Sequence, residues 1–457
     1  MYLKDIINTK SKIKFNEIKL NSRDLNKNDL FIPFGGIEDR NKYIADALNK
    51  KCSCVITNIN YNNKKVFKVK DLDKKIIDIF NKYYNYPLKN INLIGVTGTD
   101  GKTTITSIIS DILNCPSIGT NGFKINNKYF KLDNTTPNLD ILYKCFNKSR
   151  NNKNIVMEVS SEAYLRNRLG ALNFSVAILS DITKDHLDKH KSLENYINCK
   201  LELFKHSNIS ILNHDSKYYN LFKNNSKKYY SYGFNKKSDL RILWYKLYID
   251  KSIIKFKYKN KKYKIKYNLV GKFNVYNISS CILTLLSLGY DIDSILERIN
   301  NIKPVLGRMD LVYNKKYKII IDYAHTTNAT LNVLKFLRKF NKNIITVVGC
   351  AGERFKDKRS EIGSIVLNYS KFVIFTMDDP RNEFVNDIIN EMIGKSKKKN
   401  YLKIIDRSDA IKKGISLCKN NYILLILGKG CDNYMAINNS KIYYSDYDTV
   451  FDLINKI

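Results

Sequence analysis

The chain has 457 residues, of which 44% are hydrophobic, and a formal net charge of +36 from 79 Lys and Arg against 43 Asp and Glu. Its length suggests two to four domains, and no apolar run is long enough for a membrane-spanning helix. The lysines are spread over the whole chain among Asn, Ile and Tyr, which is typical of an AT-rich genome rather than of a nucleic-acid-binding protein. The N-terminus has no apolar signal core, and nine cysteines follow no repeated spacing. We therefore expect reduced thiols and a cytoplasmic protein.

Three successive blocks are expected along the chain, at about residues 1–87, 88–303 and 304–457. Apolar runs typical of strands alternate in them with stretches typical of helices, which predicts an α/β protein with parallel sheets. Helices are expected near 43–48, from about 105 and at 194–204, and a strand-like, hairpin-prone stretch at 255–267. The predicted strands are 30–34, 54–57, 91–97, 155–159, 176–179, 209–212, 319–322, 344–348, 372–375 and 422–426.

The most informative segment is a glycine-rich turn at residues 98–104, with the sequence Gly-Thr-Asp-Gly-Lys-Thr-Thr. It lies between the predicted strand 91–97 and a predicted helix. Small residues let the backbone approach an anion, and the N–H groups at a helix start point at it. Lys102 can then reach a terminal phosphate of a nucleotide, and the Thr103 hydroxyl can ligate Mg²⁺. An ordinary tight turn is the alternative, but both flanks fit a phosphate loop.

Further polar signals follow in the second block. Glu158 and Ser160 lie at the carboxyl end of a predicted strand, where α/β enzymes bind ligands. His186 lies in a loop after the next strand. Such a histidine is more often structural, but beside a phosphate loop and Glu158 it favours metal ligation. Lys200 lies on the predicted helix 194–204, where a lysine is by default a solvated surface residue.

Taken together, these motifs resemble those of the Mur ligases of bacterial peptidoglycan synthesis, and most closely the members that add a diamino acid to UDP-N-acetylmuramoyl-L-alanyl-D-glutamate. Each motif is weak alone, but they recur in the order of the family over nearly the whole chain. They lie at residues 21–24, 97–104, 134–137, 158–161, 185–188, 271–277, 307–309, 322–326, 349–354, 358–359, 378–381 and 428–430.

This resemblance implies a three-domain α/β architecture: a UDP-sugar-binding domain over 1–87, a central P-loop ATP-binding domain over 88–303, and a Rossmann-like amino-acid-binding domain over 304–457. It also implies an ATP-dependent ligase that uses Mg²⁺. The substrate carboxylate attacks the γ-phosphate of ATP, and an amine then displaces phosphate from the acyl phosphate. The chemistry agrees, because Lys102 and Mg²⁺ would neutralise the repulsion between the two anions. We expect a monomer without membrane insertion.

The resemblance also implies roles for individual residues. Those for ATP are Gly98, Thr99, Asp100, Gly101, Lys102, Thr103, Thr104, Asn274 and Arg308, with Asp322 through His325 nearby. Those for the UDP-muramoyl dipeptide are Ser22, Thr135, Thr136, Ser160, Arg166 and Arg168. Those for the incoming amino acid are Arg354, Asp378, Asp379, Pro380, Arg381, Gly428 and Asp432. The catalytic set is Lys102, Glu158, His186 and Lys200, and the metal set is Thr103, Glu158, His186 and a Lys200 carbamylated by CO₂. For Asn274 and Asp322, a loop cap is the alternative role.

Some positions depart from the family pattern. Glu162 stands where many relatives have His, Asp379 where Asn is usual, and Cys431-Asp432 where His-Glu is usual. Arg381 resembles the arginine that relatives use for meso-diaminopimelate, so we expect this acid over L-lysine. Pairing with Glu383 or helix capping is the alternative role of Arg381. Two other functions stay open: a related ligase such as folylpolyglutamate synthase, and a basic nucleic-acid-binding protein.

Overall fold

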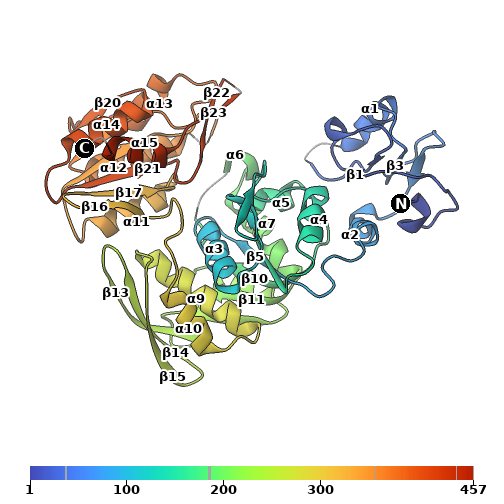
Figure 1. Cartoon of the computed structure of the whole chain (residues 1–457), viewed down its shortest axis with the longest axis horizontal. Helices are drawn as coiled ribbons and strands as arrows, with labels where there is room; N and C mark the ends of the chain where they lie inside the picture. Colours follow the sequence, from blue (N-terminus) through green and yellow to red (C-terminus); the bar gives the residue numbers. More distant parts are fainter. Residues whose placement is uncertain (37–38, 184–186, 355, 439, 456–457) are drawn as a thin grey trace. The chain divides into compact units, whose positions relative to one another are not determined.

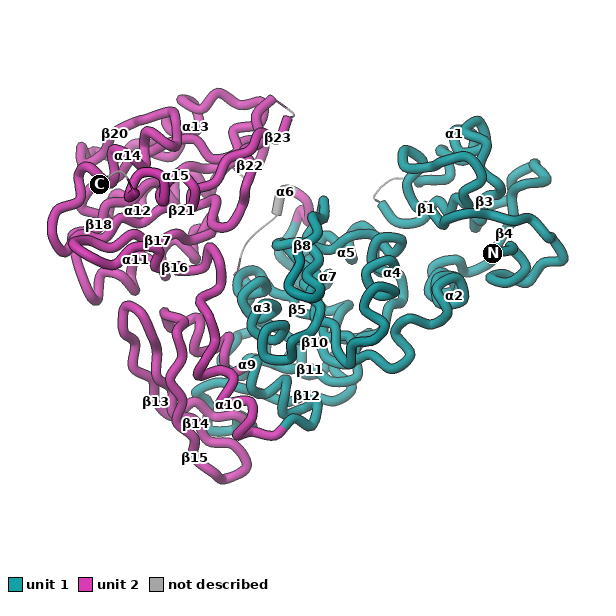
Figure 2. The backbone as a smooth tube through the Cα atoms, in the orientation of Figure 1, with its two compact units in different colours: residues 1–182, 192–239, 280–290 teal, residues 183–191, 240–279, 291–457 magenta. Residues whose placement is uncertain are grey.

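The computed structural model describes residues 1–36, 39–183, 187–354, 356–438 and 440–455. They form two compact units, coloured separately in Figure 2: residues 1–182, 192–239 and 280–290 in unit 1, and residues 183–191, 240–279 and 291–457 in unit 2. Helices and largely parallel sheets make up both units (Figure 1), so the predicted α/β class is confirmed. The predicted domain boundaries near 87 and 303 stay a prediction. Every helix in the described ranges is too short or too polar to cross a lipid bilayer.

Unit 1 begins with a small parallel sheet in the strand order β1-β2-β3-β4. The predicted strand 30–34 is shorter than expected and ends at Phe31, because Pro33 has no backbone N–H to continue the ladder. Phe31, Ile44 and Val55 meet in one buried cluster below α1. The elements are η1 (Leu3–Asp5), β1 (Ile18–Lys19), η2 (Ser22–Asp24), β2 (Leu30–Phe31), η3 (Arg40–Tyr43), α1 (Ile44–Asn49), β3 (Cys54–Thr57), β4 (Val66–Lys68) and α2 (Leu72–Tyr83).

The main sheet of unit 1 has the order β12-β11-β10-β5-β9-β6-β7-β8, parallel except at β7 and β8. The strands are β5 (Asn92–Thr97), β6 (Ser117–Gly119), β7 (Gly122–Ile125), β8 (Lys128–Phe130), β9 (Asn154–Glu158), β10 (Phe174–Leu179), β11 (Ser207–Asn213) and β12 (Tyr229–Gly233). The helices are α3 (Lys102–Leu113), α4 (Leu139–Lys148), α5 (Ser161–Leu165), α7 (Leu193–Lys205) and α8 (Tyr219–Asn224). All four strands predicted here are confirmed to within two residues.

Strands β5 and β9 lie at the centre of this sheet and are buried over nearly their whole length. Strands buried on both faces have unbroken apolar sequences, which is why the sequence showed them clearly. Since β5, β9 and β10 are parallel, their carboxyl ends meet at one edge. The polar residues that follow these three strands are therefore brought together, as expected for a ligand site in an α/β sheet.

The larger part of unit 2 is a sheet in the order β16-β17-β21-β18-β19-β20, with only β16 antiparallel. Helices α11, α12 and α13 cover one face, and α14 and α15 cover the other. The four strands predicted here are confirmed to within one residue. The elements are β16 (Asp310–Asn314), β17 (Lys318–Asp322), α11 (Thr327–Leu337), β18 (Ile344–Val348), α12 (Asp357–Tyr369), β19 (Phe372–Phe375), α13 (Val385–Ile393), β20 (Tyr401–Lys403), α14 (Arg407–Leu417), β21 (Ile423–Leu427), β22 (Tyr434–Ile437), β23 (Ser440–Tyr443) and α15 (Asp446–Ile454).

Unit 2 also contains three consecutive antiparallel strands, and the hairpin predicted at 255–267 is confirmed in two of them. Its two turn residues, Lys259 and Asn260, both have positive φ, as a type I′ turn requires. The elements are α6 (Leu187–His190), β13 (Leu240–Leu247), β14 (Ser252–Tyr258), β15 (Lys261–Tyr267) and α10 (Ile292–Asn300), while α9 (Lys272–Ser287) has residues in both units.

Candidate active site

The turn between β5 and α3 has the geometry of a phosphate loop. Gly98 and Gly101 both have positive φ, and a Cβ on Gly98 would lie 1.9 Å from the Ser180 hydroxyl. The backbone N–H of Thr99 donates to the carbonyl of Asp181 at 2.6 Å, which holds the turn against the end of β10. The turn delivers the chain into the 12-residue helix α3. The positive end of the helix dipole therefore lies at the loop, where an anion is favoured.

Two lysine ammonium groups lie on this loop. Lys102 Nζ donates to the carbonyl oxygens of Gly98 and Thr99 at 3.0 and 2.8 Å. Lys200, on α7, is 2% exposed, and its Nζ donates to the same Gly98 oxygen at 2.8 Å and lies 4.3 Å from the Tyr196 ring centroid. Lys200 is therefore not the solvated helix residue that is the default for lysine. The structure places it at the phosphate loop.

Glu158 ends β9 and is 1% exposed. Its Oε2 accepts from the Thr103 hydroxyl at 3.1 Å, and its Oε1 accepts from the backbone N–H of Thr120 at 2.9 Å. Thr103 and Glu158 also line a small cavity of about 20 Å³, enough for one water molecule or small ion. A hydroxyl and a carboxylate are oxygen ligands of the kind that Mg²⁺ prefers, so these two residues fit the predicted metal. The predicted ligand His186 lies outside the described residues.

Three residues predicted for the UDP-muramoyl dipeptide meet at the carboxyl end of β9. The Thr136 hydroxyl donates to the carbonyl of Glu158 and accepts from the backbone N–H of Ser160, both at 2.9 Å. Arg168 Nη1 donates to the carbonyl of Thr136 at 3.0 Å. The other three predicted residues lie in the same unit: Ser22 in η2, Thr135 beside Thr136, and Arg166, whose Nε lies 3.5 Å from Glu162.

In unit 2, three predicted carboxylates surround a buried lysine. Lys429, 1% exposed, donates to Asp379 Oδ1 at 2.8 Å, and its Nζ lies 3.9 Å from the carboxylates of both Asp378 and Asp432. Burial raises the pKa of Asp432 to about 6 and also raises that of Asp378. Burial opposes protonation of Lys429, but Asp378 and Asp379 hold its pKa above the ordinary value. Three carboxylates against one ammonium leave the cluster with an excess of negative charge, which attracts cations.

Arg381 is joined to this acidic cluster through the backbone of Ala436. The Ala436 N–H donates to Asp379 Oδ1, and its carbonyl accepts from the Arg381 N–H at 2.9 Å. The guanidinium donates to the carbonyl of Gly352 at 3.2 Å. Glu383 pairs instead with Arg359, at 2.8 Å, and the N-cap of α13 is Phe384. Neither alternative role of Arg381, pairing with Glu383 or capping a helix, is what the structure shows.

The remaining predicted residues of unit 2 brace loops. Asp322 ends β17 and accepts from the backbone N–H groups of Met309 and Ala324 at 2.7 and 2.8 Å. The Arg308 guanidinium lies 4.5 Å from the ring centroid of Tyr323. Elsewhere in unit 2, Asn274 donates to the carbonyl of Val270, and His325 contacts the carbonyl of Tyr323. Arg354 lies in the loop between β18 and α12. These contacts fit the loop-cap alternative for Asn274 and Asp322, and their role toward ATP stays a prediction.

Sequence reasoning named Lys429 only as part of a motif and missed Arg407 and Asp446. These last two form a fully buried ion pair in which Arg407 Nη2 and Nε each donate to Asp446 at 2.8 Å. Arg407 also donates to the carbonyls of Met377 and Leu427. The pair therefore fixes the strand ends that carry Asp378 and Gly428. No local signal could have found it, because the partners lie 39 residues apart.

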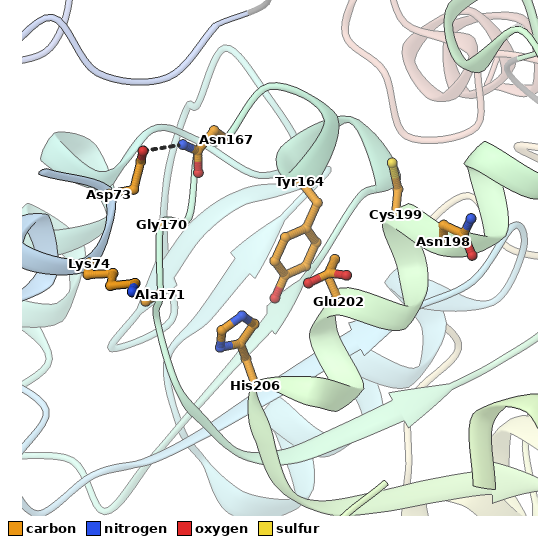
Figure 3. Close-up of a pocket in the computed structure, with 10 residues that line it drawn as sticks. All are labelled: Asp73, Lys74, Tyr164, Asn167, Gly170, Ala171, Asn198, Cys199, Glu202 and His206. Atoms are coloured by element: carbon orange, nitrogen blue, oxygen red, sulfur yellow. Dashed lines mark hydrogen bonds between the residues drawn. The ribbon is translucent and has the colours of Figure 1, made fainter. Parts of the chain in front are cut away.

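Unit 1 has another pocket, of about 470 Å³, which contains none of the predicted site residues. Figure 3 shows Tyr164 in its wall, with Glu202 and His206 of the α7 segment on one side and Lys74 on the other. Burial raises the pKa of Tyr164, and among the residues that the structure describes its hydroxyl has no hydrogen-bond partner. Asn167 Nδ2 donates a hydrogen bond to Asp73 Oδ1 at 2.8 Å in the lining of this pocket. Nothing in this pocket points to one chemical class of ligand.

The sequence matches the family descriptions "Mur ligase middle domain" over residues 96–285 and "Mur ligase, glutamate ligase domain" over residues 307–430. It is 34% identical to a UDP-N-acetylmuramoyl-L-alanyl-D-glutamate–2,6-diaminopimelate ligase of Clostridium acetobutylicum, covering 98% of this chain and 97% of that protein. A ligase of the same description from Fusobacterium nucleatum is 35% identical, covering 95% and 92%. A solved structure of such a ligase superposes with a TM-score of 0.70 at 24% identity, covering 98% and 97%. The chain therefore belongs to the Mur ligase family of ATP-dependent amide ligases.

Proposed function

We propose that this protein joins meso-2,6-diaminopimelate to UDP-N-acetylmuramoyl-L-alanyl-D-glutamate at the expense of ATP, in peptidoglycan synthesis. The observation that carries the proposal is the end-to-end similarity to ligases described as performing this reaction. A match over the whole length covers the segments that we expect to bind ATP, the UDP-muramoyl dipeptide and the amino acid. The geometry of the two units supports the proposal independently, since each unit carries one half of the required chemistry.

The nucleotide half is supported by the phosphate loop. The carboxylate of the dipeptide would attack the γ-phosphorus of ATP, which forms an acyl phosphate and releases ADP. Lys102 and the start of α3 would stabilise the negative charge that develops on the transferring phosphoryl group. The amine of the amino acid would then attack the acyl carbon, expel inorganic phosphate and lose a proton.

Magnesium is part of the proposal, with Thr103 and Glu158 among its holders. Bound there, the ion would supply charge neutralisation between the phosphate groups and the incoming carboxylate. Thr103 donates to Glu158 Oε2 at 3.1 Å, and both residues line the same small cavity, so their oxygens can reach a single ion. The carboxylate of a carbamylated Lys200 would add a further oxygen ligand, since the Lys200 amine lies at the same loop.

The amino-acid half is supported by the acidic cluster and Arg381. The excess negative charge of Asp378, Asp379 and Asp432 around Lys429 suits the ammonium groups of a diamino acid. The guanidinium of Arg381 suits a carboxylate in bidentate contact. Diaminopimelate carries both kinds of group at each end. L-lysine is the second candidate, because the same acidic cluster also suits an amine end that has no carboxylate.

The deciding experiment measures phosphate release with ATP, Mg²⁺, UDP-N-acetylmuramoyl-L-alanyl-D-glutamate and one amino acid at a time. We expect release with meso-diaminopimelate and little with L-lysine, D-alanine or glutamate. Turnover with a folate and glutamate instead would identify a folylpolyglutamate synthase, and absence of any amino-acid-dependent release would leave a non-enzymatic basic protein. The proposed monomeric state is read from light scattering of the same sample.

A further inference from the structure

The three antiparallel strands β13, β14 and β15 of unit 2 present two unlike faces. On one face, paired residues across the strands are apolar and buried, with Ile242 opposite Phe256 and Ile254 opposite Ile265. Helix α10 packs near β15. This face accounts for the stability of the sheet, and it leaves the opposite face turned to solvent.

The solvent face consists of three rows, each with one residue from every strand. The cross-strand register gives the rows Arg241–Lys257–Lys262, Trp244–Lys255–Lys264 and Lys246–Ile253–Lys266. We call these nine residues the cationic face. Seven of the nine are Lys or Arg, and none is Asp or Glu. Throughout the described part of the chain, none of the seven forms an ion pair with a carboxylate. The acids nearest in sequence are Asp239, which accepts hydrogen bonds from Ser231, and Asp250, which lies in the β13–β14 turn beside Lys251.

This arrangement does not serve the stability of the sheet. Lys255 lies directly opposite Lys264, and Lys257 directly opposite Lys262. Like charges in directly opposed positions of an antiparallel pair are destabilising. Alternating lysine with glutamate at these positions would stabilise the same strands, so the stability of the fold does not account for the uniform sign of the face.

Two of the nine residues of the cationic face are apolar: Trp244 in the middle row on β13, and Ile253 in a neighbouring row on β14. Trp244 is 46% exposed and is the one tryptophan of the whole sequence. Trp244 and Ile253 are diagonal neighbours on the adjacent strands β13 and β14. Aromatic side chains can bridge the distance between such positions. An exposed Trp beside a half-buried Ile, on a face with seven cations, combines the two attractions that hold peripheral proteins on anionic membranes. These are burial of apolar groups at the headgroup boundary and attraction to lipid phosphates.

We propose that the cationic face docks this protein on the surface of an anionic lipid bilayer. A broad face that spans three strands fits a planar surface of many phosphates. Single-stranded nucleic acid is the other polyanion to consider, but it is bound in grooves with several aromatic platforms for successive bases. This face has a single aromatic residue, since Tyr245 and Tyr263 are opposite Ile254 and Phe256 and belong to the buried face.

The single tryptophan makes a direct test possible. Its fluorescence is recorded while the full-length protein is titrated with vesicles of phosphatidylcholine containing about one third phosphatidylglycerol. We expect a shift of the emission to shorter wavelength that saturates with lipid, is absent with pure phosphatidylcholine and is reversed by high salt. An unchanged spectrum, together with no protein in sedimented vesicles, overturns the proposal.

Two triple variants distinguish the effect of the cationic face on vesicle binding from the effect of the overall charge of +36. The first variant, Lys262→Glu/Lys264→Glu/Lys266→Glu, reverses the charge of three residues on β15. It places carboxylates opposite Lys257 and Lys255, so the strands should pair at least as well. The matched control, Lys395→Glu/Lys397→Glu/Lys399→Glu, removes the same charge from an exposed loop after α13. At about fivefold per cation, the first variant should weaken vesicle binding by at least about 100-fold.

The control should bind like the unmodified protein. Equal weakening in both variants would show that overall charge, and not the cationic face, attracts the vesicles, and this overturns the proposal. Tighter binding of a single-stranded oligonucleotide than of vesicles, lost in the first variant alone, would assign the face to nucleic acid instead. Ligase turnover without vesicles should be unchanged in both variants, which keeps this test independent of the proposed reaction.

Discussion

The ammonium groups of Lys102 and Lys200 both donate to one backbone oxygen, that of Gly98, at 3.0 and 2.8 Å. Lys102 belongs to the phosphate loop itself, and Lys200 comes from the separate helix α7. Two like charges on one acceptor repel each other, and the buried position of Lys200 strengthens this repulsion. Conversion of the Lys200 amine to an anionic carbamate would replace the repulsion by attraction.

The first prediction is therefore that Lys200 is carbamylated in the active enzyme. Activity should fall when CO₂ is removed rigorously, and Lys200→Ala should lose at least about 100-fold in turnover, as for other groups that stabilise transferring charge. Lys205→Ala, on the exposed end of the same helix, is the matched control and should keep its activity. A carbon-13 carbamate signal from protein equilibrated with labelled CO₂ gives a readout besides activity. Full turnover in Lys200→Ala would disprove the role.

The second prediction concerns Thr103 and Glu158. Glu158→Gln and Thr103→Val should each raise the Mg²⁺ concentration needed for half-maximal turnover by roughly 10-fold or more, because each removes an oxygen ligand or its charge. Thr103→Ser retains the hydroxyl and is the control. Unchanged Mg²⁺ dependence in both Glu158→Gln and Thr103→Val, with intact folds by circular dichroism, would remove both residues from the metal site.

The third prediction is structural. Arg407→Met should destabilise unit 2 by about 3–5 kcal/mol, because it leaves the fully buried Asp446 carboxylate without its partner. Adding Asp446→Leu should restore much of the loss, since a buried ion pair can be replaced by apolar residues at little cost. Trp244 lies in unit 2, so its fluorescence during urea unfolding reports on this unit. Equal stabilities of the single variant and the unmodified protein would contradict the prediction.

Strand positions could be predicted because strands such as β5, β9, β18 and β19 are mostly apolar and buried on both sides. The phosphate loop could be placed because its glycines and Lys-Thr pair are contiguous. The length of strand β2 was overestimated, because the apolar run that predicts it continues through Pro33.

Contacts between residues that are distant in the chain could not be predicted from the sequence. No short sequence pattern shows that Lys429 lies within 3.9 Å of three carboxylates. Nor does one show that Glu383 forms an ion pair with Arg359, which leaves Arg381 for another role. Buried charges depend on which loops the sheet brings together, and strand order is a tertiary property. The roles implied by the family resemblance for such residues stay predictions until turnover is measured.

The fourth prediction is a pH dependence. Since the pKa of Asp432 is raised to about 6, its carboxylate is ionised above this pH and protonated below it. If Asp432 holds an ammonium group of the amino acid, KM for the amino acid should rise up to tenfold for each pH unit below 6. KM for ATP should not follow. Asp432→Asn should show a raised KM that is flat over this range. The same pH profile in Asp432→Asn as in the unmodified protein would assign the titration to another group.

The last prediction concerns the choice between meso-diaminopimelate and L-lysine. The two differ by a carboxylate at the far end, so a selective site needs a cation there. Among the residues that the structure describes, the Arg381 guanidinium donates one hydrogen bond, to the carbonyl of Gly352, and forms no ion pair with a carboxylate. A guanidinium–carboxylate pair contributes about 1.5–3 kcal/mol, or roughly tenfold to a hundredfold in selectivity.

Competition between the two amino acids at equal concentration should thus favour diaminopimelate, and Arg381→Ala should lose most of this preference while keeping phosphate release. Arg381→Lys keeps the charge but not the fork of donors, and should keep only part of the preference. Arg381 has a positive φ, so Arg381→Asn serves as a control for backbone strain, since asparagine tolerates this conformation best. If Arg381→Ala and Arg381→Asn retain the full preference, the far carboxylate is bound elsewhere. If the unmodified protein prefers L-lysine, the acidic cluster of Asp378, Asp379 and Asp432, and not Arg381, determines the substrate.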